Sequence, residues 1–115
     1  MIPLLPREIR KYLFDISEAC DNIATFTSGR TFSDYQADPL LRSAVERQFE
    51  IIGEALNQAL QLMPALSDKI SNTRDIIAFR HRLIHGYSSI SDEVVWGIIE
   101  ASLPVLSREV KALLS

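Results

Sequence analysis

The sequence has little of several features that define whole classes of protein. Its 115 residues include one cysteine and four glycines, and no apolar run approaches the roughly 18 residues that cross a membrane. Cys20 has no second cysteine to pair with inside the chain, which is typical of a reducing cytoplasm. The short, proline-rich start, residues 1–7, does not match a signal peptide. We therefore expect a cytoplasmic protein without a membrane segment.

Several kinds of catalytic motif are also missing. The chain has neither a Gly-x-Ser-x-Gly turn nor a glycine-rich phosphate loop, which argues against serine-nucleophile and dinucleotide chemistry. The net charge of −3 excludes a generally basic nucleic-acid coat. Residues 68–87 nevertheless carry four basic and two acidic side chains. A small positive region on an acidic protein favours a localised phosphate contact.

What is present points to helices. Hydrophobic residues make up 47% of the chain and charged residues 23%, as in an ordinary globular domain, so we expect a single domain over residues 1–115. Apolar residues recur at three- and four-residue steps and never alternate as in a strand. The first helix should run from about Pro6 to Thr27 and end at Gly29. The second should start at Asp38 and Pro39 and reach about residue 63.

The remaining elements are bounded by capping residues and prolines. Asn72 or Thr73 should cap a third helix that stops at Gly86, and Ser89 or Ser91 should cap a fourth. Ser33 and Ser67 should each cap a short turn of their own. Pro104 should form a kink or start a fifth helix, and Trp96 should pack on a neighbouring helix or at a subunit boundary. The fold class is therefore all-α, an up-and-down bundle of four to five helices.

Three single residues carry their own expectations. Cys20 lies on the apolar stripe of the first helix and is expected to be a small core residue. Gly53 interrupts the second helix at a cost of about 1 kcal/mol relative to Ala, so another backbone should approach closely there. Glu54 follows on the polar side of the same helix, where a carboxylate is ordinarily solvated, and the sequence leaves its role open.

The stretch from residue 79 to residue 87 concentrates groups that move protons or hold phosphate. At about 100° per residue, Arg80 falls inside the apolar arc of its helix. A buried guanidinium needs partners, or its stem can lie along the core while its head reaches water; both arrangements remain open. His81 and His85 fall one turn apart at the edge of that arc.

The histidine pair has the spacing of two metal ligands on one helical face. In zinc peptidases of this pattern a glutamate follows the first histidine, whereas Arg82 follows it here and would repel a cation. No further cluster of histidine or cysteine supplies additional ligands. We expect no metal and no other cofactor.

RNA cleavage without a metal suits these residues better. Histidine can act as acid or base near neutral pH, and arginine can hold a phosphate through two hydrogen bonds. Arg80 and His85 supply both roles, and Tyr87 adds a phenol. A twofold dimer would supply two histidines and two arginines in one cleft, so we expect an obligate homodimer.

The spacing Arg80-x4-His85-x-Tyr87 resembles the motif of the HepT-like toxins, a branch of the HEPN superfamily of helical domains. The flanks are similar too: residues 51–55 resemble the family's I-I-G-E-A helix, and residues 74–87 resemble its central block. Residues 94–96 and 103–104 resemble its last helices. The similarity runs in one order over nearly the whole chain. The family often has an aromatic residue and a glycine after the tyrosine, where this chain has Ser88 and Ser89.

The resemblance implies a HEPN-like bundle that forms a homodimer or a larger oligomer, and a metal-independent endoribonuclease toxin of a type II or type VII toxin–antitoxin pair. Arg80 and His85 would be catalytic and His81 would assist. The implied partner is a nucleotidyltransferase-fold antitoxin (MntA-like) that adenylylates Tyr87, and added adenylate would bring negative charge to the phosphate site. The alternative is a non-catalytic accessory or nucleotide-binding module of a nucleotidyltransferase.

Overall fold

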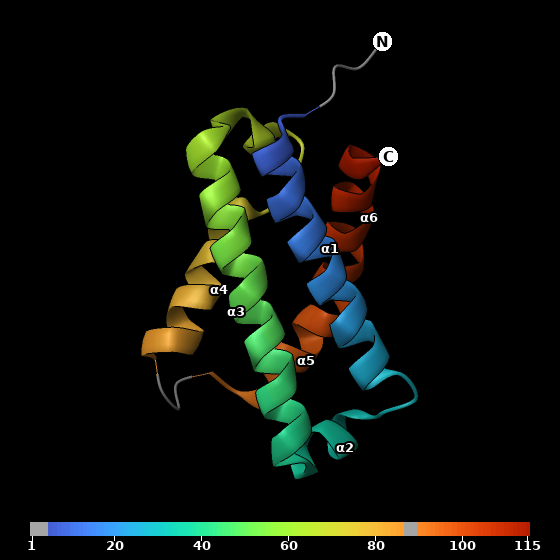
Figure 1. Cartoon of the computed structure of the whole chain (residues 1–115). Helices are drawn as coiled ribbons and strands as arrows, with labels where there is room; N and C mark the ends of the chain where they lie inside the picture. Colours follow the sequence, from blue (N-terminus) through green and yellow to red (C-terminus); the bar gives the residue numbers. More distant parts are fainter. Residues whose placement is uncertain (1–4, 87–89) are drawn as a thin grey trace.

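The computed structural model describes residues 5–86 and 90–115, and within those residues it contains helices and no strand (Figure 1). In chain order the elements are α1 (Arg7–Thr27), α2 (Phe32–Ala37), α3 (Pro39–Leu62), the 3₁₀ turn η1 (Pro64–Asp68), α4 (Thr73–His85), α5 (Asp92–Gly97), the π-helical turn η3 (Ile98–Ser102) and α6 (Leu103–Leu114). The all-α prediction is confirmed. No helix of the described part combines the length and the apolar character that a membrane crossing needs.

The long helices alternate in direction, as the up-and-down prediction requires. In Figure 1, α1 and α3 lie side by side, α4 packs beside α3, and α6 packs beside α1. The continuous segment from α5 through η3 to α6 serves as the last helix. The apolar stripe of α1 is buried as expected and includes Ile9, Leu13, Ile16, Cys20 and Ile23. Burial of each large side chain of this kind contributes about 1.5–3 kcal/mol.

Cys20 is the one titratable member of that stripe. Its side chain is 2% exposed, and burial raises the pKa of its thiol to about 12. Because the thiolate is the reactive form of cysteine, this thiol is inert at neutral pH. The expectation of a small core residue is confirmed.

Two predicted helix boundaries are confirmed by their hydrogen bonds. The Asp38 carboxylate accepts from the backbone N–H groups of Leu40 and Leu41 at 3.1 Å each, with Pro39 in the first turn. Gly29 adopts φ 73° just after α1, a conformation that glycine reaches without strain. These local signals set the start of α3 and the end of α1.

The predicted caps at Ser33 and Ser67 are wrong. Thr31 caps α2: its hydroxyl accepts from the Asp34 N–H at 3.1 Å, and the Asp34 carboxylate accepts from the Thr31 N–H at 2.9 Å. This reciprocal pair needs an acidic side chain three residues after the cap, and Ser33 lies inside the helix. The Ser67 hydroxyl lies inside η1 and donates to the carbonyl of Pro64.

The structure shows which residues cap α4 and α5 and where Pro104 lies. Asn72 precedes α4 with φ 59° and caps it without a side-chain hydrogen bond, and Ser91 caps α5 by accepting from the Val94 N–H at 3.2 Å. The π turn η3 comes directly before α6, which carries Pro104 in its first turn. Proline has no N–H to donate, so a local change of helical hydrogen bonding at this point is expected.

Aromatic rings and carboxylates lie close together where α2, α3 and α5 meet. The Trp96 ring lies 5.5 Å from the Tyr35 ring, so tryptophan packs on a neighbouring helix of its own chain. Tyr35 is fully buried, its hydroxyl has no hydrogen-bond partner in the described residues, and burial raises its pKa. Burial also raises the pKa of the half-buried Glu46 carboxyl, and repulsion from Asp92 and Glu50 adds to the effect.

Glu46→Gln is expected to raise the melting temperature at pH 7. A carboxyl group whose pKa is raised on folding stabilises the folded state below its ordinary value of 4.5 and loses that contribution as the pH rises through the raised value. Arg42 opposes the shift without removing it. Thermal melts of both proteins between pH 3.5 and 8 should show a gain at neutral pH that vanishes in acid. Glu18→Gln, at an exposed site of α1, is the control and should show no such trend. A gain that is the same at every pH would contradict the explanation.

Candidate functional site

The helix α4 carries most of the predicted site and is held mainly by one face. None of its residues is fully buried, and Ile76, Ile77, Phe79 and Leu83 pack half-buried against the core. Phe79 meets Phe49 of α3 edge-on, with ring centroids 5.3 Å apart. At the end of α4, the Gly86 N–H donates to the Arg82 carbonyl at 2.7 Å. The other face of α4, which includes His81, Arg82 and His85, is exposed to solvent.

Arg80 lies on the packed face of α4, directly over Gly53 of α3. A Cβ atom added to Gly53 would lie 2.3 Å from the Arg80 Cβ and 2.9 Å from its Cγ and Cδ, far inside van der Waals contact. A neighbour does approach this glycine closely, but the expectation of another backbone there is wrong: the nearest atoms belong to the aliphatic stem of Arg80. Any side chain at position 53 would push α4 away from α3.

The guanidinium of Arg80 is paired within the chain. Its Nη2 lies 2.6 Å from Oε2 of Glu54, and the other oxygen of Glu54, Oε1, accepts from Gln58 Nε2 at 3.1 Å. The Arg80 side chain is 27% exposed, and its Nε is buried without a hydrogen-bond partner in the described residues. The structure combines the two arrangements left open for this arginine: its stem lies against α3, and its partly exposed head is paired with Glu54. Glu54, whose role the sequence leaves open, is 47% exposed and is the ion-pair partner of Arg80.

This ion pair lies in a groove of about 230 Å³ between α1, α3 and α4. The groove is lined by charged side chains and a few apolar ones: Tyr12, Asp15, Arg47, Glu50, Ile51, Glu54, Ala55, Arg80 and Ile84. Two of the carboxylates have other cations as partners, since Asp15 pairs with Lys11 at 3.3 Å and Glu50 with Arg47 at 3.4 Å. Each of the three carboxylates that line the groove is thus paired with a different cation, and Arg80 is the partner of Glu54.

The two histidines lie elsewhere on α4. His81 and His85 are both exposed, and their ring centroids are 4.6 Å apart. Neither histidine lines the groove that contains Arg80. The structure therefore brings the two histidines together, and it pairs Arg80 with Glu54 in a groove that the histidines do not line. Tyr87, Ser88 and Ser89 lie outside the described residues, as does the alternative cap at Ser89.

A metal centre finds no support in the described part of the chain. Residues 5–86 and 90–115 contain no group of three or more His, Cys, Asp or Glu side chains that could hold an ion. The histidine pair could supply two ligands at most, and Arg82 lies between them in the sequence.

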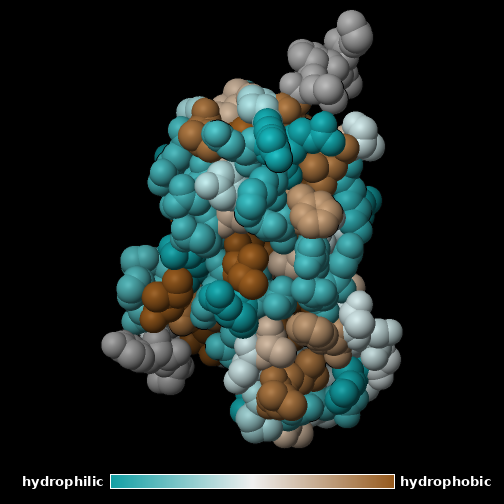
Figure 2. All heavy atoms as spheres, in the orientation of Figure 1, coloured by the Kyte–Doolittle hydropathy of each residue, from teal (hydrophilic) through white to brown (hydrophobic). Residues whose placement is uncertain are grey.

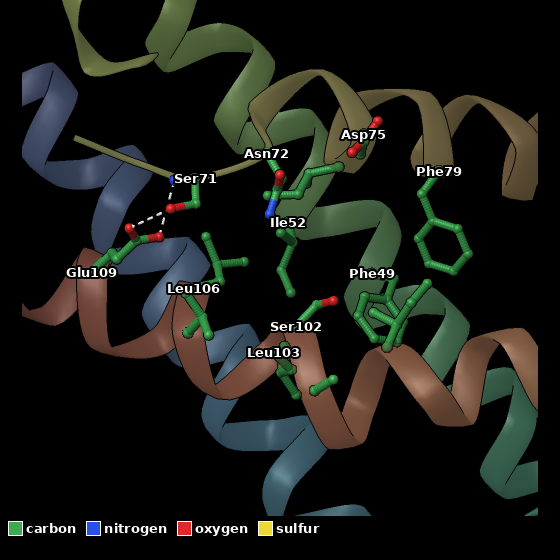
Figure 3. A pocket seen from close by; sticks show the side chains of 14 residues that line it. Phe49, Ile52, Ser71, Asn72, Asp75, Phe79, Ser102, Leu103, Leu106 and Glu109 are labelled. Carbon is green, nitrogen blue, oxygen red and sulfur yellow. Dashed lines mark hydrogen bonds between the residues drawn. The ribbon is translucent and has the colours of Figure 1, made fainter. Parts of the chain in front are cut away.

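A second cavity of about 300 Å³ lies behind α4, between α3, α4 and the segment from η3 to α6 (Figure 3). Its apolar wall includes Phe49, Ile52, Phe79, Leu103 and Leu106. At one end Glu109 accepts from the backbone N–H and the hydroxyl of Ser71, at 3.0 and 2.7 Å. This cavity shows that the packing behind α4 is incomplete, in agreement with the half-buried state of its apolar residues.

Sequence reasoning missed Glu54, and one signal could have found it. A mid-helix glycine implies a close neighbour, and the residue beside that glycine lies at the edge of the same contact. A carboxylate at that edge can meet a cation carried by the neighbouring helix, as Glu54 meets Arg80. Which cation it meets depends on how α4 is placed on α3.

Fold and site together define a small all-α protein whose exposed helix carries a paired arginine and a histidine pair. A family profile described as "Ribonuclease HepT-like" matches residues 16–113. The chain is 32% identical to "Probable ribonuclease HepT" of Thermococcus cleftensis, over 95% of this chain and 98% of that protein. It is 31% identical to "Putative RNase TTE0752" of Caldanaerobacter subterraneus subsp. tengcongensis, over 91% and 93%. No solved structure matches the chain. The protein belongs to the HepT-like ribonuclease family, as the sequence motif predicted.

Gly53→Ala is expected to destabilise the fold by roughly 1–3 kcal/mol, because the new methyl group overlaps the Arg80 stem. Intrinsic helix propensity alone would favour alanine by about 1 kcal/mol. Gly97→Ala is the matched control, since a Cβ at that helical position meets nothing within 4 Å, and it should be neutral or stabilising. Urea denaturation gives both values. Equal stability of the two variants would show that α4 is free to move outward at no cost.

Proposed function

We propose that this protein is a metal-independent endoribonuclease and the toxin of a toxin–antitoxin pair. The observation that carries the proposal is the placement of Arg80 and His85 on one helix with a solvent-exposed face, in a chain that belongs to the HepT-like ribonuclease family. The chain offers a phosphate-binding cation and a group that transfers protons near neutral pH.

The reaction assigned to these residues is attack of the ribose 2′-OH on the neighbouring phosphorus. A neutral imidazole takes the 2′-OH proton, the bond from phosphorus to the 5′ oxygen breaks, and a protonated imidazole returns a proton to that oxygen. Arg80 holds the negative charge that builds on the phosphate oxygens. His85 is the acid/base group, and His81, one turn away and in ring contact with it, orients it.

Two arguments support a homodimer as the active form. One subunit separates the histidine pair from the groove of Arg80, so a complete site needs a second copy to bring an arginine and a histidine together. The helix α4 is also incompletely covered, and its Ile84 is 39% exposed beside the groove. Figure 2 shows one face of the molecule, on which apolar patches are separated by hydrophilic surface. Because α4 is incompletely covered and carries the exposed Ile84, the proposed dimer contact centres on α4.

The proposed regulator is a nucleotidyltransferase-fold antitoxin acting in the cytoplasm. Its proposed target is Tyr87, which follows His85 by two positions in the sequence. An adenylate on this phenol would add bulk and negative charge next to the phosphate site, which repels RNA.

A second candidate is a non-catalytic binding module that accompanies a nucleotidyltransferase. The observation that favours it is the ion pair of Arg80 with Glu54, since a cation neutralised in its own chain attracts phosphate less strongly than a free one. The two candidates differ in what purified protein does to RNA and in what expression does to cells.

His85→Ala is expected to lower RNA cleavage by about 10²–10⁴-fold, because general acid–base catalysis contributes that much. The assay uses purified protein and labelled RNA in excess chelator, and wild type should remain active there. Arg108→Ala, at an exposed position of α6, is the control and should cleave as wild type does. Expression of wild type without its partner should arrest growth, and expression of the variant should not. Full activity of the His85 variant would reject this acid–base assignment. No cleavage and no arrest by wild type would favour the binding module.

Ile84→Glu is expected to convert the dimer to monomer, because it places a charge on the proposed contact. Leu40→Glu is the matched control: Leu40 is 80% exposed at the start of α3, away from α4, and the variant should stay dimeric. Light scattering during size-exclusion chromatography measures the mass of each protein. A monomeric wild type at every concentration would rule out the dimer.

A further inference from the structure

We propose that Glu54 is a positioning residue that fixes the direction of the Arg80 guanidinium for phosphate binding. The inference rests on the proposed ribonuclease function and assigns a role to a carboxylate outside the Arg80-x4-His85-x-Tyr87 motif. The motif supplies the Arg80 guanidinium, and α3 supplies the Glu54 carboxylate that orients it.

The pairing is specific to these two side chains. Three carboxylates line the groove, and each of them contacts a different cation: Asp15 contacts Lys11, Glu50 contacts Arg47, and Glu54 contacts Arg80. The Arg80 to Glu54 contact is the shortest of the three at 2.6 Å. It also joins two helices, whereas the others each lie within one helix.

The arginine is held at both ends of its side chain. Its stem lies against Gly53, where the space left by the missing Cβ is filled by its Cβ, Cγ and Cδ. Its head meets Glu54, which is itself held by the hydrogen bond from Gln58 one turn further along α3. Contacts within the chain thereby hold both ends of a side chain that has four rotatable bonds.

Such fixation matters for catalysis because a guanidinium binds phosphate through a planar fork of N–H donors. It carries five donors, and among residues 5–86 and 90–115 the structure shows an ion pair at Nη2 and none at Nη1. A fork already fixed in direction needs no reorganisation when charge builds on the phosphate, which is the condition for strong electrostatic stabilisation of a transition state. Glu54 would act through Arg80 and would not touch RNA.

A purely electrostatic effect of Glu54 on RNA binding and a positioning effect on Arg80 predict different changes in KM and kcat, and this difference allows a test. The groove lining carries two arginines and three carboxylates, so removal of any one carboxylate makes it more favourable for RNA. If Glu54 were only a surface charge, Glu54→Gln would lower KM and leave kcat unchanged. A positioning residue instead requires that kcat falls although KM does not rise.

The experiment compares Glu54→Gln with Glu50→Gln. Both remove one negative charge from the same groove, but Glu50 contacts Arg47 and not Arg80. We expect Glu54→Gln to lower kcat by about tenfold or more without raising KM, as misplacement of a catalytic group does. Glu50→Gln should keep kcat within about twofold of wild type. Thermal melts check that both variants are folded, and Glu54→Asp, which keeps the charge but shortens the side chain, should give an intermediate kcat.

A double-mutant cycle with Arg80→Ala completes the test under single-turnover conditions. If Glu54 acts through Arg80, then Glu54→Gln in the Arg80→Ala background should cause no further loss. A further tenfold loss there, or equal kcat values for the two glutamine variants, would overturn the role of Glu54 and leave the proposed function standing. A wild type that cleaves no RNA would instead overturn the proposed function, and the inference about Glu54 with it.

Discussion

The contact between Gly53 of α3 and the stem of Arg80 of α4 sets the geometry on which the site depends. With an added Cβ at 2.3 Å from the Arg80 Cβ, no other residue fits at position 53 unless α4 moves outward. This contact brings the guanidinium to the carboxylate of Glu54, at 2.6 Å. A glycine in the middle of α3, which costs that helix about 1 kcal/mol relative to alanine, thus determines where the charge of Arg80 lies on α4.

The same contact determines where the histidines lie. Because Arg80 faces α3, His81 and His85 fall further around α4 and stay exposed, with their rings 4.6 Å apart. In a single subunit, Arg80 lines the groove beside α3, and neither histidine does. This separation gives a structural reason for the proposed dimer, in which two copies would combine what neither presents alone.

Much of the helical architecture could be predicted from local signals. The start of α3 at Asp38 and Pro39, the end of α1 before Gly29 and the buried stripe of α1 all follow from capping chemistry and helical periodicity. The cap of α2 was missed, because Thr31 and Ser33 are both suitable hydroxyls. The choice between them depends on the carboxylate of Asp34, which reaches back to the Thr31 N–H.

The sequence alone determined the helices and the core stripe, because hydrogen bonds and side chains a few residues apart decide both. It also determined the family, because the spacing of Arg80, His85 and Tyr87 can be read directly from the sequence. It also placed Arg80 on an apolar face and Gly53 at a close contact. Only the tertiary structure decided that these two meet and that Glu54 is the partner of the arginine. Such pairings depend on how one helix is placed on another, and many apolar side chains together set that placement.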